Sequence, residues 1–120
     1  PGTPYSNGDE WPNFNHVSGQ GIRYTAATDF NPNCYINNLP FIGSLLVQRN
    51  NVHPYEALVS MTRNSAKTTP RADGLVHGKI EIGAVANFNI LKSQHWESWC
   101  MTPGSSPIHT VCLEGNIVEI

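Results

Sequence analysis

The sequence predicts a mainly β protein: a small antiparallel β-sandwich or barrel-like domain of roughly six to eight short strands. Composition is the first reason. The 120 residues include thirteen Asn, nine Ser, eight Thr, ten Gly and nine Pro, which favour turns and strands over helices. The second reason is that several short segments alternate apolar and polar side chains, which is the period of a strand. A chain of this length is expected to form one domain.

The strongest candidate for a central buried strand is residues 39–48, LPFIGSLLVQ. A run of this length is short for a stable lone helix, and Pro40 and Gly43 argue against a helix interior. We expect Gly43 to form a bulge or a close backbone approach, and residues 45–47 to be covered on both faces. The rest of the chain is then expected to pack around this strand.

The first twenty residues, 1–20, are interrupted by Pro and Gly and are expected to form an extended arm, and residues 21–120 the β domain. Polar turns and loops are expected at 29–34, 49–54 and 64–74. The other strands are predicted at 21–28, 55–63, 75–82, 85–91, 108–113 and 117–120. A helix is the alternative for 55–63, although its β-branched residues and its position after a loop favour a strand.

Charge and cysteine content exclude several classes of protein. The chain has seven Lys and Arg against nine Asp and Glu, for a net charge of −2, and its basic residues form no cluster along the sequence. Nucleic acid is therefore not expected as a partner. No apolar run approaches the roughly 20 residues that cross a bilayer, so no membrane insertion is expected. The three cysteines are expected to be free thiols, with a Cys100–Cys112 disulfide as the alternative.

Residues 20 to 100, approximately, contain several sequence features in a characteristic order. It comprises a Gly-Ile-x-Tyr strand, a Leu-Pro segment, a Gly followed by an apolar strand, and a closing Trp-x-x-Trp pair. The residues that carry it are Gly21, Ile22, Tyr24, Leu39, Pro40, Gly43, Leu45, Leu46, Val47, Trp96 and Trp99. This order resembles the knob domains in tail fibres of bacteriophages and R-type pyocins, from which the chain departs by a long insertion at about 64–89 and by its continuation after the Trp pair.

The resemblance implies a homotrimeric receptor-binding tip domain of a phage or tailocin fibre or spike. Such a domain recognises bacterial cell-surface glycan, does no chemistry, and belongs to the virion or the extracellular space. Two alternatives stay open. One is a small polysaccharide-acting enzyme with Glu81 and Glu97 as its carboxylate pair, and the other is a structural virion or trimerisation domain without a ligand.

A glycan site requires exposed aromatic rings and short amide side chains. We expect it on the loops that flank the 39–48 strand, together with one tryptophan. Under a strand interpretation Trp99 shares a face with Glu97, which favours Trp99 over Trp96. The predicted binding residues are Trp99, Tyr35, Tyr55, Asn33, Asn37, Asn38, Asn50 and Asn51.

Motifs for catalysis or metal binding are weak in this sequence. No G-x-S-x-G elbow occurs, and the only Cys and His set of suitable type lacks the close ligand pairs of a zinc site. That set is His95, Cys100, His109 and Cys112. We therefore predict no catalytic residue, no metal site and no cofactor.

Overall fold

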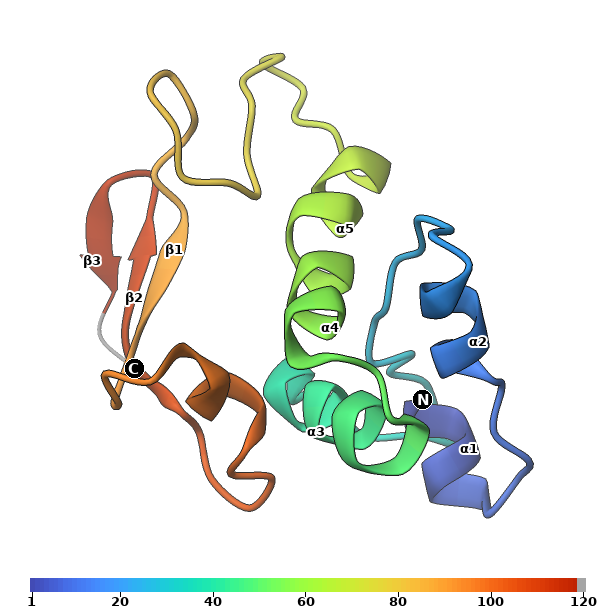
Figure 1. Cartoon of the computed structure of the whole chain (residues 1–120). Helices are drawn as coiled ribbons and strands as arrows, with labels where there is room; N and C mark the ends of the chain where they lie inside the picture. Colours follow the sequence, from blue (N-terminus) through green and yellow to red (C-terminus); the bar gives the residue numbers. More distant parts are fainter. Residues whose placement is uncertain (119–120) are drawn as a thin grey trace.

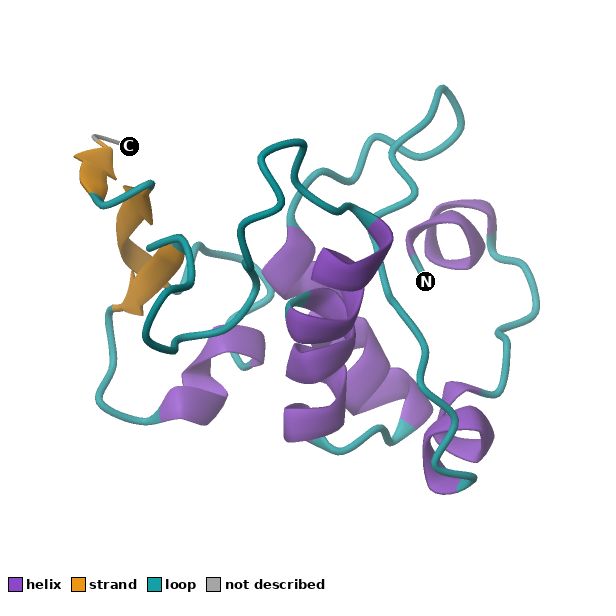
Figure 2. Cartoon of the chain, turned by 90° about the horizontal axis from the view of Figure 1, so that it is seen from above, coloured by secondary structure: helices purple, strands orange, loops and turns teal. Residues whose placement is uncertain are grey.

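The computed structural model describes residues 1–118, and helices outweigh strands in this part of the chain. It contains five α-helices, one 3-10 helix and one sheet of three strands. Figure 1 shows the five α-helices on one side of the molecule and the sheet on the other, and Figure 2 shows the same separation from above. The predicted mainly β sandwich or barrel of six to eight strands is therefore wrong.

The central element is a helix, α3 (Leu39–Asn50), where residues 39–48 were predicted to form a strand. Asn38 caps the helix, since its side-chain oxygen accepts a hydrogen bond from the N–H of Phe41 at 3.0 Å. Pro40 lies in the first turn, where a helix does not need the missing N–H. The proline that argued against a helix interior therefore belongs to a helix start.

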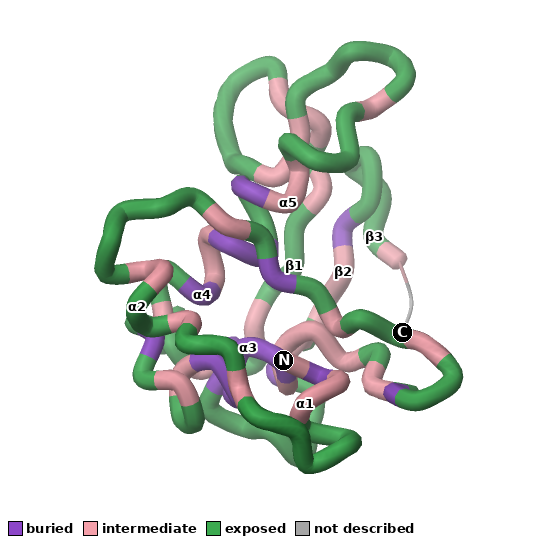
Figure 3. Tube along the Cα trace, turned by 90° about the vertical axis from the view of Figure 1, so that its right-hand side faces the viewer, coloured by how far each residue is buried: buried purple, intermediate pink, exposed green. Residues whose placement is uncertain are grey.

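One face of α3 forms the middle of the hydrophobic core. Its buried apolar side chains have helical spacing, at Ile42, Leu45 and Leu46. Gly43 lies between them, and a Cβ there would overlap the indole ring of Trp99. Gly43 is thus a site of close approach, as predicted, but between a helix and a tryptophan. Figure 3 shows buried segments at α3 and α4, with further ones at α5 and on β2.

Two further helices replace the strand predicted at 55–63. They are α4 (Pro54–Met61) and α5 (Arg63–Thr68). The His53 side chain caps α4 by accepting a hydrogen bond from the N–H of Tyr55 at 3.2 Å. The face that α4 turns to the core carries Ala57, Ser60 and Met61. The helical alternative for this segment is therefore the correct one.

The N-terminal part is only partly extended. Two short helices, α1 (Gly2–Asn7) and α2 (Phe14–Gly19), occupy the stretch predicted to be an extended arm. Residues 21–28 belong to no strand in the described structure. They run beside α4, where the N–H of Ala26 donates to the carbonyl of Ser60 at 3.3 Å. This contact supplies a partner that a sheet was expected to supply.

The sheet comes from the C-terminal part of the chain. Strands β1 (Phe88–Leu91), β2 (Ile108–Leu113) and β3 (Asn116–Val118) pair in antiparallel fashion in that order. The strand predicted at 108–113 is confirmed by β2. The last predicted strand is confirmed as far as residue 118, and its final positions, 119–120, lie outside the described residues.

The segment before the sheet is irregular. Residues 75–87 form bends and turns, not the strand predicted at 75–82, and the loop arches from α5 to β1 at the top of Figure 1. Ile80 and Ile82 alternate with charged residues as in a strand, yet both are almost fully exposed. The polar loop predicted at 64–74 begins only after α5 ends at Thr68.

All three cysteines are buried free thiols, so the alternative Cys100–Cys112 disulfide is not formed. Burial suits a free thiol, which packs as a small apolar side chain. Among residues 1–118, no helix has both the length and the apolar character to cross a membrane.

Candidate functional site

The predicted glycan-binding tryptophan lies in the core. Trp99 belongs to the 3-10 helix η1 (Trp96–Cys100) and is 6% exposed, packed on α3. A strand would have placed Trp99 beside Glu97 on a free face, but the 3-10 helix removes that geometry. Trp96 is the exposed member of the pair, at 42%, and its ring stands edge-on to Tyr55 with 6.3 Å between centroids.

Three of the predicted asparagines have structural roles at the ends of α3. Asn38 is the N-cap, Asn51 is the left-handed C-cap with φ 54°, and Asn50 donates from Nδ2 to the carbonyl of Leu45 at 3.4 Å. The other predicted site residues, Asn33, Asn37 and Tyr35, are exposed near the N-terminal end of α3. Since α3 is 12 residues long, its two ends lie roughly 18 Å apart, and the predicted residues form separate patches.

The turn at 29–34 contains a strained acidic residue. Asp29 has φ 55°, in the left-handed region that non-glycine residues rarely adopt. Local bonds hold this conformation: Asn31 donates from Nδ2 to the carbonyl of Asp29 at 2.5 Å, and Asn31 also pairs with Cys34 through backbone hydrogen bonds. Backbone strain in an exposed turn is a feature of functional loops, because surrounding contacts must maintain it.

The Asp29 carboxylate is exposed and oriented. Thr3 of α1 donates its hydroxyl to Oδ2 of Asp29 at 2.6 Å. Helix α1 packs directly on the turn, since a Cβ at Gly2 would overlap the carbonyl of Thr28 and meet the sulfur of Cys34. The carboxylate is therefore held from one side and open on the other, where it could accept a proton or a hydrogen bond from a bound molecule. The sequence predicted a turn at 29–34, but Asp29 was not among the predicted site residues.

The two carboxylates of the alternative enzyme prediction, Glu81 and Glu97, belong to different segments, the loop 75–87 and η1. Glu81 is bound to Lys79 by an ion pair of 2.6 Å in the exposed loop. Glu97 is exposed in the first turn of η1. Across the described residues, no three His, Cys, Asp or Glu side chains gather in an arrangement that could hold a metal ion.

Comparison with known proteins finds relatives that are all named as enzymes of one kind. No family model matches the chain. The relatives found by sequence are imidazolonepropionases: the chain is 28% identical over 119 residues to that of Haloarcula marismortui and 30% identical over 119 residues to that of Bacillus cytotoxicus. A probable imidazolonepropionase of Nematostella vectensis is 34% identical over 77 residues.

The match covers the chain but only part of each relative. It includes 99% of this chain and 28% of the Haloarcula marismortui protein, and 98% and 28% for the Bacillus cytotoxicus protein. For the Nematostella vectensis protein the shares are 64% and 18%. Almost the whole chain therefore matches the Haloarcula marismortui and Bacillus cytotoxicus proteins, but it spans little more than a quarter of their length.

These relatives overturn the predicted class. They are enzymes of cellular organisms, so the predicted description as a viral tail-fibre adhesin is wrong. The predicted virion or extracellular location is wrong for the same reason. The enzyme alternative fits better, though no relative is named for a polysaccharide substrate. Whether the chain forms a homotrimer or contacts a bacterial glycan stays a prediction from the sequence.

Proposed function

We propose that this chain is one portion of an enzyme that acts on imidazolonepropionate or a closely similar compound, and that it contributes the Asp29 turn to the active site. The observation that carries the proposal is the extent of the similarity, 119 residues that take in 99% of the chain. Because the same match spans 28% of the relative, the remainder of the catalytic fold comes from further polypeptide.

The surface of the chain supports this proposal. Its accessible area is 7877 Å² for 13.2 kDa, whereas a folded monomer of that mass exposes about 6,400 Å². Its radius of gyration is 14.8 Å, against about 13.6 Å for a compact domain of this length. The excess includes apolar side chains that a complete domain buries, among them Ile80, Ile82 and Ile117. Contact with further polypeptide would cover them.

The role of Asp29 follows from the chemistry that the relatives' name implies. An imidazolone ring carries a cyclic amide and ring N–H groups, and a carboxylate can accept a hydrogen bond from such an N–H or take a proton from an attacking nucleophile. Thr3 holds the Asp29 carboxylate by a 2.6 Å hydrogen bond, which limits its rotation. We assign Asp29 the role of proton or hydrogen-bond acceptor and Thr3 that of a positioning residue.

The test is a chimera in which this chain replaces the matched 119 residues of the Bacillus cytotoxicus enzyme. We expect the chimera to consume imidazolonepropionate, followed by loss of the substrate's ultraviolet absorbance. Asp29→Asn in the chimera is expected to lower kcat by roughly 10²- to 10⁴-fold, the usual contribution of a positioned acid or base. Its melting temperature should stay within a few degrees of the parent.

Asp9→Asn is the matched control, since Asp9 is an exposed acid next to α1 with no side-chain hydrogen bond or ion pair within residues 1–118. This variant should keep full activity. A chimera that folds but is inactive with Asp29 present would contradict the proposal for the chain. Full activity of the Asp29→Asn chimera would contradict the assignment of the turn.

A further inference from the structure

Most of the positive charge of the chain lines one cleft. The cleft has a volume of about 570 Å³, and its lining contains five of the seven Lys and Arg residues and no acidic residue. It lies between α5, the loop that follows α5, and the segment before Tyr24. The five cations are Arg23, Arg63, Lys67, Arg71 and Lys79. Such a concentration of charge is unexpected in a chain with net charge −2.

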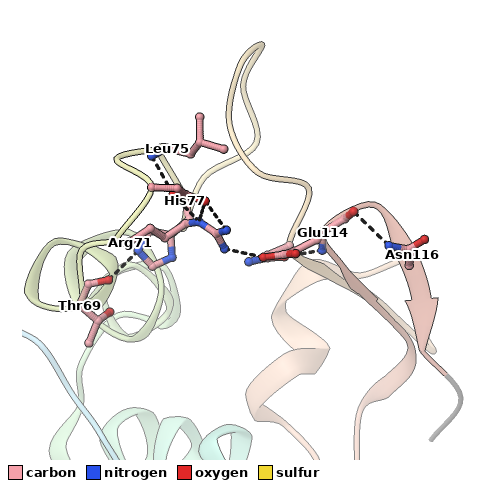
Figure 4. A network of polar contacts seen from close by, with 8 residues as sticks. Thr69, Arg71, Leu75, His77, Glu114 and Asn116 are labelled. Atoms are coloured by element: carbon pink, nitrogen blue, oxygen red, sulfur yellow. Dashed lines mark hydrogen bonds and ion pairs between the residues drawn. The ribbon is translucent and has the colours of Figure 1, made fainter.

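Two of these cations have carboxylate partners. Arg71 pairs with Asp73 at 2.6 Å and with Glu114 at 2.8 Å, as Figure 4 shows for the contact with Glu114. Lys79 pairs with Glu81 at 2.6 Å. Each partner fixes its cation in place at the wall of the cleft.

The other three cations are uncompensated. Arg23, Arg63 and Lys67 have no carboxylate within ion-pair distance among residues 1–118. Arg63 and Lys67 lie one turn apart on the same side of α5, where like charges repel. A bound anion would remove this repulsion, and cations that line a concave surface raise the local concentration of anions.

The walls of the cleft are built by specific contacts. The buried side chain of Asn64, on α5, donates from Nδ2 to the carbonyl of Tyr24 at 3.0 Å and so anchors the backbone next to Arg23. On the opposite wall, Nε2 of His77 is 2.9 Å from the carbonyl of Thr69.

The loop also touches the helix directly. A Cβ at Gly78 would overlap the side chain of Ala66 on α5. Gly78 has φ 75°, which favours glycine, so both its conformation and its close approach depend on the missing side chain. Helix and loop are therefore held at a defined separation.

We propose that this cleft is a binding site for a small organic molecule with two or three anionic groups, carboxylate or phosphate. Three uncompensated cations match that charge. The volume is in the range of small-molecule sites and far exceeds one oxyanion. Apolar lining by Pro70, Leu75 and Val76 provides contact for the organic part. The cleft shares no lining residue with the Asp29 turn, so this site is additional to the proposed active site.

The test is isothermal titration calorimetry of the purified protein with citrate, with fructose 1,6-bisphosphate and with acetate. We expect one molecule of citrate or of the bisphosphate to bind per chain, and acetate to give no measurable binding. Binding by citrate alone identifies a polycarboxylate site, and binding by the bisphosphate alone identifies a phosphate site. Added NaCl should weaken binding, because the three uncompensated cations are exposed.

Matched variants distinguish binding by the cations of the cleft from nonspecific attraction of anions to the charge of the protein. Arg63→Gln and Lys67→Gln should each weaken binding at least tenfold, since each removes an uncompensated cation of the lining. The chain offers Arg49→Gln and Lys92→Gln as controls, because these are its two basic residues outside the cleft. The controls should change the affinity less than twofold. Melting temperatures of all four should match the parent protein.

Three results would overturn the proposal. One is absence of binding by both citrate and the bisphosphate. Another is equal weakening by the cleft variants and the control variants. The third is binding of only a long polyanion, such as a single-stranded oligonucleotide. Asp29→Asn should leave the affinity unchanged, so the outcome is independent of the proposed enzyme activity.

Discussion

At the scale of single residues, Gly43 decides how closely η1 approaches α3. Alanine is a better helix former than glycine by roughly 1 kcal/mol, so Gly43→Ala would stabilise an isolated helix. In the folded protein the new Cβ would overlap the ring of Trp99. We expect a net loss of about 1–3 kcal/mol in the free energy of unfolding, measured by urea denaturation.

The control for this substitution is Gly104→Ala, because a Cβ at Gly104 meets nothing within 4 Å. That variant should change the free energy of unfolding by less than about 0.5 kcal/mol. If Gly43→Ala stabilises the protein, η1 does not pack on α3 in solution.

Asp73 provides a residue-scale prediction for pH. Hydrogen bonds from the Arg71 guanidinium and from the N–H of Leu75 lower the pKa of Asp73 from 3.8 to about 2. A lowered pKa means that the carboxylate contributes stability above its ordinary pKa, and that this contribution is lost as the pH falls through about 2. A titration followed by NMR should give a midpoint for Asp73 near the lower value.

Arg71→Gln should return the midpoint for Asp73 toward 3.8, because the first cause of the shift is removed. Lys92→Gln removes a charge elsewhere and should leave the midpoint unchanged. An unshifted midpoint in the parent protein would show that the Arg71–Asp73 pair and the hydrogen bond from the N–H of Leu75 are not formed.

At the scale of elements, η1 joins the sheet side of the molecule to the helical core. Trp99 is buried against α3, whereas Trp96 is half exposed beside Tyr55. We expect Trp99→Ala to cost about 3–5 kcal/mol of unfolding free energy, the usual range for a large buried aromatic side chain. Trp96→Ala should cost about 1 kcal/mol, which is the order of an edge-on aromatic pair. Thermal melting of the two variants checks the order, and a reversed order would contradict the packing of η1.

At the scale of the whole molecule, the loop 75–87 exposes isoleucine side chains of the kind that proteins usually bury. Ile80 and Ile82 are almost fully exposed. Replacing both with Thr should therefore change the free energy of unfolding by no more than about 0.5 kcal/mol, while lowering the binding of a hydrophobic dye such as ANS and any concentration-dependent association seen by light scattering. Ile42→Thr is the contrasting variant, since Ile42 is fully buried.

A large loss of stability in the Ile80 and Ile82 double variant would show that both side chains are already covered in the isolated chain. The excess surface would then have another origin, and the proposed packing against further polypeptide would lose its structural support.

Local features of the fold could be predicted from the sequence. The turn at 29–34 and the strand at 108–113 appear where they were expected, because Asn, Asp and Pro favour turns and because alternation in β2 agrees with its pairing. The signals for α3 were also present, as Asn38 two residues before Pro40 is a helix start. The sequence nevertheless favoured a strand here, because Pro40 and Gly43 are unfavourable in a helix interior and the apolar run is short for a lone helix.

The sequence by itself therefore determined the turn at 29–34 and the strands at 108–113 and 117–118, since each depends on neighbouring residues. Tertiary structure alone decided that Trp99 is buried and that the predicted strand at 75–82 stays unpaired. It also decided that five cations, from positions 23 to 79, meet in one cleft although no basic cluster exists along the chain. The reason is physical: burial, strand pairing and electrostatic potential depend on which distant segments become neighbours, and neither composition nor periodicity specifies that.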